Sequence, residues 1–293
     1  MHKAGFVNIV GNPNVGKSTL MNQLVGEKLS IATFKAQTTR HRIMGIVNTE
    51  DSQIVFSDTP GVLKPNYKMQ EMMLQFSESA LADADILLYV TDVIEDPEKN
   101  MDFLEKVAKM SIPVILLINK IDESDQKKLG DLVTKWHGLL PNAEILPISA
   151  KNKFGTDILL KRVHELLPES PAFFDKDQLT DKPAKFFVSE IIREKILRYY
   201  DKEIPYSVEV VVESFKEDDR QIHINAVIYV ERNSQKGIII GHQGMALKKV
   251  STEARKSLER FFDKKIFLET LVKVDKDWRN SQKELKYFGY NPE

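Results

Sequence analysis

The sequence predicts an α/β domain with a mostly parallel sheet, followed by a smaller α+β domain. In the first half, short apolar runs alternate with longer helical patterns, as expected of strands buried on both faces of a parallel sheet. This alternation stops near Pro168, and after Pro183 a helical pattern precedes two strands. A chain of 293 residues has room for two domains of roughly 100–200 residues each.

The elements of the first domain follow from apolar runs and helical periodicity over residues 1–170. Apolar runs predict strands at 6–10, 52–57, 86–90, 114–118 and 144–148. Helical patterns lie at 18–25, 69–82, 101–110, 126–139 and 156–167.

The second half begins with a segment rich in Pro and Asp. Residues 171–184 lack apolar periodicity and are interpreted as a linker or docking loop, with a second domain over 185–293. That domain is expected to hold a helix over 185–199 and a hairpin of strands 207–215 and 221–230. A helix over 245–262, a strand over 265–274 and a short terminal helix follow.

Charge and cysteine content exclude several classes of protein. The 42 Lys and Arg nearly balance the 43 Asp and Glu, and this net charge of −1 by itself speaks against nucleic-acid binding. Residues 236–265 differ, with eight basic and three acidic side chains. The absence of cysteine excludes disulfides and thiolate zinc sites and fits a reducing cytosol. The N-terminus lacks the pattern of a signal peptide, and no apolar run approaches the ~20 residues of a membrane span.

A phosphate-binding loop is predicted where the first strand ends. Residues 11–18 read G-N-P-N-V-G-K-S, which fits the pattern G-x-x-x-x-G-K-[ST] between a strand and a helix. Backbone N–H groups of such a loop point at phosphate oxygens, and the helix N-terminus adds its partial positive charge. The alternative is a chance glycine turn. The expected phosphate contacts are Gly11, Asn12, Pro13, Asn14, Val15, Gly16, Lys17, Ser18 and Thr19.

A second motif follows the strand that ends near Ser57. Asp58 can orient a magnesium-bound water, and the Gly61 N–H can sense a γ-phosphate. Taken alone, Asp-x-Pro-Gly is a common turn sequence. Its place at a strand end favours a role in the nucleotide site, contributed by Asp58, Thr59, Pro60, Gly61 and Val62.

Two further motifs indicate guanine. Asp122, in the run Asn119-Lys120-Ile121-Asp122, can accept hydrogen bonds from guanine N1–H and its exocyclic amine, for which adenine has no equivalent. The alternative is a helix cap at Asp122. The Lys120 stem can lie over the base, and Ser149, Ala150 and Lys151 can contact guanine O6 through the backbone.

The order of these four motifs over residues 4–168 resembles that of P-loop GTPases. The resemblance implies GTP hydrolysis with Mg²⁺ held by Ser18, Thr39 and Asp58, and catalytic roles for Lys17, Thr39 and Gly61. Thr39 is favoured over Thr38 because related GTPases place the ligand just before an arginine.

One position departs from the Ras-like pattern. Val62 stands where Ras-like GTPases carry a glutamine that positions the attacking water, so slow intrinsic hydrolysis is expected. In some relatives an asparagine at the position of Asn14 helps bind K⁺, which substitutes for an arginine finger.

The second domain carries a G-x-x-G motif before an amphipathic helix. With the apolar residues 238–240 before it, the motif resembles a KH domain of the type II topology, in which the glycines approach an RNA backbone. The alternative is a helical hairpin that packs without RNA. His242 is interpreted as a backbone contact rather than a base. The expected RNA contacts are Lys236, Ile240, Gly241, His242, Gln243, Gly244, Lys248, Lys249 and Arg255.

A P-loop GTPase followed by one KH domain resembles the Era family, including the run T-T-R-H-R at 38–42. The resemblance implies binding near the 3′ end of small-subunit ribosomal RNA, GTP-controlled RNA affinity and a role in small-subunit assembly. It further implies a cytoplasmic protein with peripheral inner-membrane contact, and no DNA partner. Two other functions stay open: a P-loop ATPase, and an RNA-binding scaffold with a vestigial nucleotide site.

Overall fold

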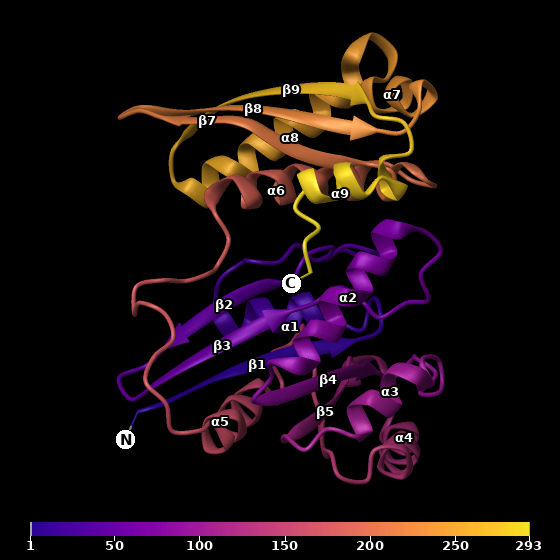
Figure 1. Ribbon diagram of the computed structural model, residues 1–293, viewed down its shortest axis with the longest axis vertical. Helices are drawn as coiled ribbons and strands as arrows, with labels where there is room; N and C mark the ends of the chain where they lie inside the picture. The colour runs from indigo at the N-terminus through magenta and orange to yellow at the C-terminus, as the bar shows by residue number, and fades with distance from the viewer. Residues whose placement is uncertain (1, 293) are drawn as a thin grey trace. The chain divides into compact units, whose positions relative to one another are not determined.

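The computed structural model describes residues 2–292 and divides into two compact units (Figure 1). The first extends to Asp181 and holds the predicted nucleotide site. The second, Lys182–Asn291 with Tyr67–Met69, holds the G-x-x-G motif. Each unit has a sheet and a hydrophobic core of its own.

The sheet of the first unit has six strands in the order β2-β3-β1-β4-β5-β6. All neighbours are parallel except β2 and β3. The strands are β1 (Lys3–Gly11), β2 (Ile43–Asn48), β3 (Ser52–Asp58), β4 (Ile86–Asp92), β5 (Val114–Asn119) and β6 (Glu144–Pro147). Because β1, β3, β4 and β5 run in the same direction, the predicted nucleotide motifs meet at one edge of the sheet.

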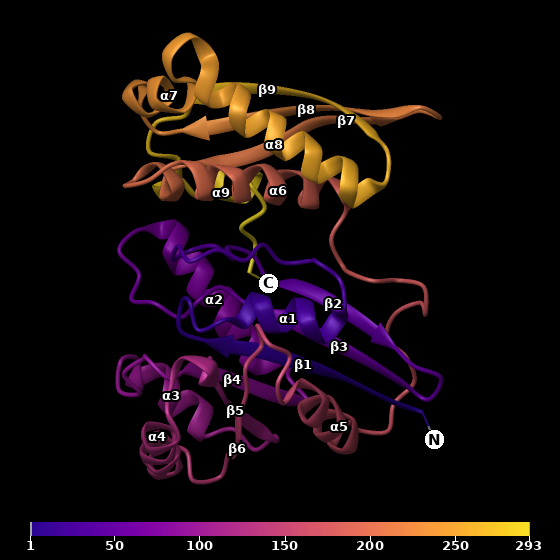
Figure 2. The ribbon, with the colours of Figure 1, turned by 180° about the vertical axis from the view of Figure 1, so that it is seen from behind.

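Helices cover both faces of this sheet. Helices α2, α3 and α4 lie on one face, and α1 and α5 lie on the other (Figures 1 and 2). The first face packs apolar side chains of α3 and Trp136 of α4 against Leu87 and Leu116 of the sheet. The helices are α1 (Lys17–Val25), α2 (Lys68–Ala82), α3 (Met101–Ala108), α4 (Gln126–Leu139) and α5 (Thr156–Leu166).

Strand β2 is an element that the apolar pattern does not predict. Gly45 in its centre weakens the strand signal, since glycine is depleted in strands. The structure gives the reason for the glycine. A Cβ at Gly45 would lie 2.6 Å from the side chain of Met21 and 2.7 Å from that of Val25, both on α1. Close packing of α1 on the sheet therefore favours the residue that weakens the strand signal.

The segment predicted as a linker is ordered against the first unit. Thr180 forms a bridge to Gly45, and the Ile46 N–H donates to the Leu179 carbonyl at 2.8 Å. The first compact unit therefore ends after Asp181 rather than at residue 170. The sequence allows the segment to be either a linker or a docking loop. The contacts of residues 171–181 with β2 fit a docking loop.

The second unit is an α+β domain with a three-stranded sheet in the order β7-β8-β9. Strands β7 and β8 are antiparallel, and β8 and β9 are parallel. Helices α6 and α8 pack on one face of the sheet, around a core that includes Ile192, Ile228 and Ala254 (Figure 2). The elements are α6 (Ala184–Tyr199), β7 (Glu209–Glu217), β8 (Gln221–Val230), α7 (Asn233–Ile240), α8 (Met245–Phe262), β9 (Lys265–Val274) and α9 (Gln282–Tyr287).

Candidate nucleotide and RNA sites

The phosphate loop joins the end of β1 to the start of α1. Gly16 caps α1 in a left-handed conformation, with φ of 97°. A side chain at Gly16 would collide with Asn119, since its Cβ would lie 2.3 Å from Nδ2. Asn12 and Val15 are buried, whereas Asn14 is exposed. The loop is therefore anchored on its inner side, and Asn14 is open to a ligand.

Lys17 is buried within this loop. Its ammonium group donates hydrogen bonds to the carbonyl oxygens of Gly11 at 2.9 Å and Asn12 at 2.7 Å. Burial lowers the pKa of Lys17 to about 8, although the nearby carboxylates of Asp58 and Glu95 act in the opposite direction. A buried ammonium group that contacts carbonyl oxygens is stabilised when an anion binds beside it. The predicted β- and γ-phosphates fit this environment.

Three oxygen-bearing side chains converge beside Lys17. Ser18 Oγ lies 2.8 Å from Thr39 Oγ1, which donates to Asp58 Oδ2 at 3.4 Å. The other oxygen of Asp58, Oδ1, is buried and has no hydrogen-bond partner among residues 2–292. Burial raises the pKa of Asp58, and the charge of Lys17 opposes that rise. A buried oxygen without such a partner, beside two hydroxyl groups, is a suitable donor set for Mg²⁺, which prefers oxygen ligands.

The structure separates the two candidate threonines. Thr39 faces Ser18 and Asp58. The Thr38 hydroxyl instead donates to the Lys35 carbonyl at 2.6 Å and lies 2.7 Å from Thr33 Oγ1. Of the two, Thr39 is thus the one directed at the predicted metal site.

The segment that follows β3 lies directly against the phosphate loop. Thr59 donates to the Ile9 carbonyl at 2.8 Å, and the Pro60 carbonyl accepts from Ser77 at 2.8 Å. Gly61 approaches so closely that a Cβ there would lie 2.7 Å from Pro13 Cα. A glycine at position 61 is therefore required for this approach.

Val62 points away from the phosphate site. Its side chain is 4% exposed and packs into the core between the sheet and α3. Its N–H donates to the Gly11 carbonyl at 3.1 Å. An apolar, buried side chain cannot hold an attacking water, so the position occupied by glutamine in Ras-like proteins contributes only its backbone.

The predicted guanine-binding residues are connected by side-chain hydrogen bonds. Asn119 donates to the Val15 carbonyl at 2.8 Å and accepts from the Ala150 N–H at 2.9 Å. Ser149 donates to Asp122 at 2.6 Å, which fixes the carboxylate at the site edge. Asn119 thereby ties the phosphate loop to the loop of residues 149–151, in which the Lys151 side chain is exposed.

Lys120 links the base site to the phosphate loop. It adopts a left-handed backbone conformation with φ of 62°. Its ammonium group donates to the Asn14 carbonyl at 2.7 Å and to Asp92 Oδ2 at 2.6 Å. The aliphatic stem therefore spans the site, as expected for a side chain that covers the base plane.

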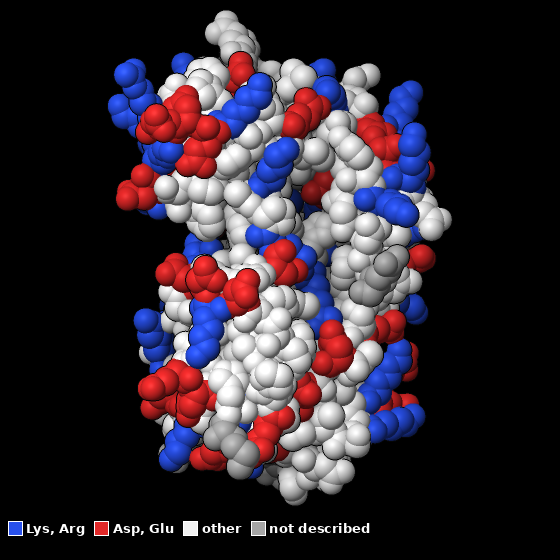
Figure 3. Space-filling model, turned by 60° about the vertical axis from the view of Figure 1, so that its left-hand side comes forward, with Lys and Arg blue, Asp and Glu red and all other residues white. Residues whose placement is uncertain are grey.

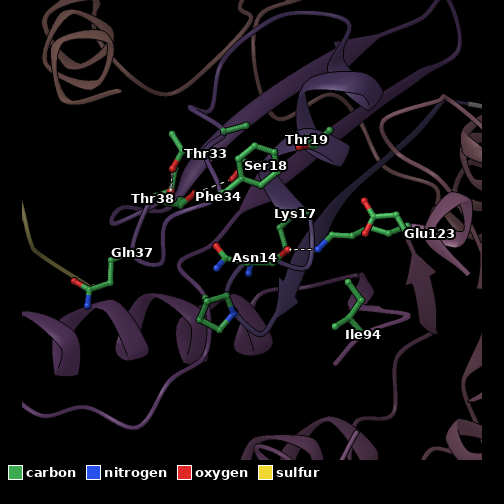
Figure 4. Close-up of a pocket in the computed structure, with 16 residues that line it drawn as sticks. Asn14, Lys17, Ser18, Thr19, Thr33, Phe34, Gln37, Thr38, Ile94 and Glu123 are labelled. Atoms are coloured by element: carbon green, nitrogen blue, oxygen red, sulfur yellow. Dashed lines mark hydrogen bonds between the residues drawn. The ribbon is translucent and has the colours of Figure 1, made fainter. Parts of the chain in front are cut away.

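Phosphate-loop residues, Thr39, Gly61 and Lys120 line a cavity of about 400 Å³, which is large enough for a nucleotide (Figure 4). The predicted residues Asp58, Asn119, Asp122 and 149–151 are not among its lining residues. Sequence patterns missed several of its lining residues. Phe34 is fully exposed, and an aromatic residue in an otherwise polar loop is a signal that could have indicated it. The others carry no motif. The lining residues outside the predicted set are Ala32, Thr33, Phe34, Gln37, Ile94 and Glu123.

The G-x-x-G motif joins α7 to α8 in the second unit, as seen from behind in Figure 2. Gly241 ends α7 with φ of 70°, and a Cβ there would lie 2.6 Å from that of Ala246. His242 and Gln243 are exposed between the two glycines. A loop with two exposed side chains ahead of a helix N-terminus is suited to contact a phosphate backbone.

The predicted basic contacts divide into two groups. Lys248 and Lys249 are exposed on the first turns of α8, and the Lys249 ammonium lies 4.4 Å from the centre of the Tyr199 ring. Lys236 is half-buried on α7. Arg255, further along α8, pairs with Glu259 at 2.7 Å, which offsets its charge. Ile240 packs against the core and contributes shape rather than a polar contact.

Known proteins resemble both units. Residues 6–120 match the family model described as 50S ribosome-binding GTPase, and residues 203–279 match that of the KH domain. GTPase Era of Clostridium kluyveri is 44% identical over 292 residues, which cover 99% of this chain and 100% of that protein. GTPase Era of Geobacter sp. is 46% identical and covers 98% of both.

Solved structures agree over the full length. Era in complex with MgGDPNP and nucleotides 1506–1542 of 16S ribosomal RNA has a TM-score of 0.95 at 37% identity, covering 99% of both chains. A single-residue variant of Aquifex aeolicus Era bound to GDP.AlF4⁻ has a TM-score of 0.94 at 37% identity, covering 98% of this chain and 99% of that one. The predicted fold, a P-loop GTPase domain followed by a type II KH domain, is confirmed. The chain therefore belongs to the GTPase Era family: it is a GTPase with a C-terminal KH domain.

Proposed function

We propose that this protein is a GTP-controlled switch that binds small-subunit ribosomal RNA near its 3′ end and assists assembly of the small subunit. The proposal depends on two features of the same chain. Ser18 and Thr39 converge on Asp58 beside the phosphate loop, and an exposed G-x-x-G loop precedes a basic helix. The Era structure with 16S ribosomal RNA nucleotides 1506–1542 supports the choice of RNA.

In the hydrolytic half of this function, residues of the first unit hold GTP for in-line attack by water on the γ-phosphorus. Lys17 and the loop N–H groups neutralise phosphate oxygens, and the Gly61 N–H reaches the γ-phosphate. Ser18, Thr39 and Asp58 would hold Mg²⁺, which would supply charge stabilisation at the phosphate oxygens. Asp122 and Ser149 select guanine.

Intrinsic hydrolysis is slow in this proposal because Val62 cannot orient water. The exposed Asn14, whose carbonyl accepts from Lys120, would help bind K⁺, and that ion would supply the positive charge that an arginine finger provides elsewhere. Turnover is expected to be at least several-fold higher in KCl than in NaCl at equal ionic strength. Equal rates in the two salts reject the role of Asn14.

RNA binding is assigned to the loop from Gly241 to Gly244 and to the adjoining lysines. His242→Asp combined with Gln243→Asp places two negative charges where the phosphates lie, on exposed positions that leave the core intact. Affinity for an RNA of nucleotides 1506–1542 is expected to fall by more than tenfold at fixed salt. The matched control is Lys264→Ala, because Lys264 already pairs with Glu217 at 2.8 Å. An unchanged affinity in the double variant assigns RNA binding elsewhere.

Coupling between the two activities is the part of the proposal that makes the protein a switch. GTP orders the loops around Thr39 and Gly61, and this state favours RNA binding; hydrolysis releases the RNA. The same RNA should therefore bind more tightly with a non-hydrolysable GTP analogue than with GDP. Equal affinities with the two nucleotides contradict the coupling.

Two other functions make different predictions. A P-loop ATPase would bind ATP as well as GTP and would not depend on the Asp122 carboxylate. An RNA-binding scaffold with a vestigial site would release no phosphate over multiple turnovers. The Era relatives and the intact Lys17, Ser18 and Asp58 favour the GTPase.

The cellular location stays a prediction. We propose a cytoplasmic protein that contacts the inner membrane peripherally. Among residues 2–292, the structure has no helix of the length and apolar character that crossing a membrane requires. Fractionation at low and high salt tests the proposal, since a peripheral contact is released by salt. Full recovery in the soluble fraction at both salt concentrations contradicts membrane contact.

A further inference from the structure

Asn100 connects the phosphate loop to the segment that follows Gly61. It lies just before α3 and is half-buried. Its side-chain nitrogen donates to Asn12 Oδ1 and to the Val62 carbonyl, the latter at 3.2 Å. An amide group has two N–H donors, so it can satisfy both acceptors at once.

The two acceptors belong to the two parts of the site that surround the γ-phosphate. The backbone carbonyl of Asn12 accepts from Lys17 at 2.7 Å. Val62 donates its N–H to the Gly11 carbonyl at 3.1 Å and buries its side chain in the core. The backbone of Val62 is therefore held by the phosphate loop at its N–H and by Asn100 at its carbonyl.

The usual structural role of an asparagine before a helix does not account for this arrangement. Side chains at that position normally cap the helix by accepting from its first N–H groups. At α3 the side chain of Asn100 makes no such bond, and its backbone carbonyl accepts from Phe103 at 3.2 Å and Leu104 at 3.1 Å. The side chain is thus committed to Asn12 and Val62, and its removal leaves the backbone bonds of α3 in place.

The neighbouring residues rigidify Asn12. The Glu95 carboxylate accepts from Thr91 at 3.1 Å, and its interaction with Asn12 opposes the rise in pKa that burial causes. Asn12 is 3% exposed, so it has little freedom to move away from Asn100. Because Asn12 is fixed, the side-chain amide of Asn100 also holds the Val62 carbonyl in place.

We propose that Asn100 is a positioning residue for GTP hydrolysis, which holds the Val62 backbone, directly after Gly61, at a fixed spacing from the phosphate loop. Val62 offers no side chain to orient water, so the placement of this backbone is what the segment contributes to the reaction. Asn100 is not among the residues that line the nucleotide cavity. Its loss should lower the hydrolysis rate much more than nucleotide affinity.

The test compares Asn100→Ala, Asn12→Ala and the double variant of the full-length protein with Mg²⁺. Single-turnover hydrolysis of GTP is expected to slow roughly tenfold in Asn100→Ala, as for the loss of two neutral hydrogen bonds. The dissociation constant for GDP should change less than about threefold, since one lost hydrogen bond to a phosphate would cost more. Lys99→Ala, an exposed neighbour, is the matched control and should behave like the wild type.

The double variant separates positioning from general destabilisation. If Asn100 acts through Asn12, the double variant hydrolyses GTP little more slowly than Asn100→Ala, because the second substitution removes an interaction already lost. Asn100→Asp retains the shape but loses both donors, and it should reproduce the alanine defect. An unchanged rate in Asn100→Ala, fully additive losses, or a parallel loss of GDP affinity overturns the proposal.

Discussion

Asp122 is expected to decide between guanine and adenine through a single carboxylate. Its Oδ1 accepts from Ser149 at 2.6 Å, so the group is held in place before a base arrives. In Asp122→Asn, the loss of a charged hydrogen bond, about 1.5–3 kcal/mol, should weaken GTP binding by roughly 10–100-fold. Competition between GTP and ATP measures the effect. Asp125→Asn is the control, because Asp125 caps α4 and asparagine caps equally well. Retained GTP preference in Asp122→Asn contradicts the assignment.

Thr38 and Thr39 form a second residue-scale test because they are adjacent and face different partners. Thr39→Ala removes a hydroxyl beside Ser18 and Asp58, so hydrolysis should slow at least roughly tenfold and half-saturation should need more Mg²⁺. Thr38→Ala removes contacts within the loop, with Lys35 and Thr33, and should slow hydrolysis less than about threefold. Turnover measured against Mg²⁺ concentration distinguishes the two, and a larger defect in Thr38→Ala reverses the assignment.

At the scale of elements, Gln53 of β3 anchors the docked segment 171–181. Its side chain is fully buried, accepts from the N–H groups of Phe173 at 2.7 Å and Phe174 at 3.0 Å, and donates to the Phe174 carbonyl at 2.8 Å. Gln53→Ala should lower the free energy of unfolding by about 2–3 kcal/mol, since several buried groups lose partners. Urea denaturation measures it.

The docked segment itself offers the control for Gln53. Gln178→Ala removes a side-chain hydrogen bond to the Thr180 carbonyl, which is 3.1 Å long, and should cost about 1 kcal/mol or less. Limited proteolysis should cut near residues 171–181 faster in Gln53→Ala than in Gln178→Ala. Equal cleavage would show that the segment is held by its backbone bonds to β2 alone.

The strands also show which parts of the fold can be predicted from the sequence. Strands β4 and β5 are buried on both faces, so their apolar runs are unbroken and readable. Strand β2 lies at an edge and contains Gly45, which the packing of α1 favours, so tertiary packing overrides local preference. Motif spacing likewise predicts Lys17 and Asp122 as nucleotide contacts. It could not find Asn100, since the place of that residue in the site depends on how distant loops come together.

At the scale of the whole molecule, the two separate cores predict that a ligand of one unit raises the thermal stability of that unit alone. GDP with Mg²⁺ at about 100 times its dissociation constant should stabilise the unit that binds it by about 2.7 kcal/mol. Calorimetry should show the transition of the nucleotide unit moving to higher temperature, while that of Lys182–Asn291 moves little. RNA should shift the other transition. A single transition that both ligands move equally would mean that the units unfold together.

Net charge indicates RNA binding only when it is counted over segments of this chain rather than over the whole chain. The net charge of −1 combines 19 basic and 22 acidic residues before residue 171 with 23 basic and 21 acidic residues after it. Figure 3 shows both signs interspersed over the visible surface. Residues 236–265 run from α7 through the G-x-x-G loop and α8 to β9, and a total over the chain conceals their basic excess.

The docked segment also limits the length of free chain between the two units. With residues 171–181 held on β2 and β3, only Lys182 and Pro183 separate Asp181 from the start of α6, a free tether of about 10 Å. Release of the segment would lengthen that tether to roughly 50 Å. Strand β2 begins four residues after Thr39, so the docking site of this segment adjoins the loop that carries the predicted magnesium ligand.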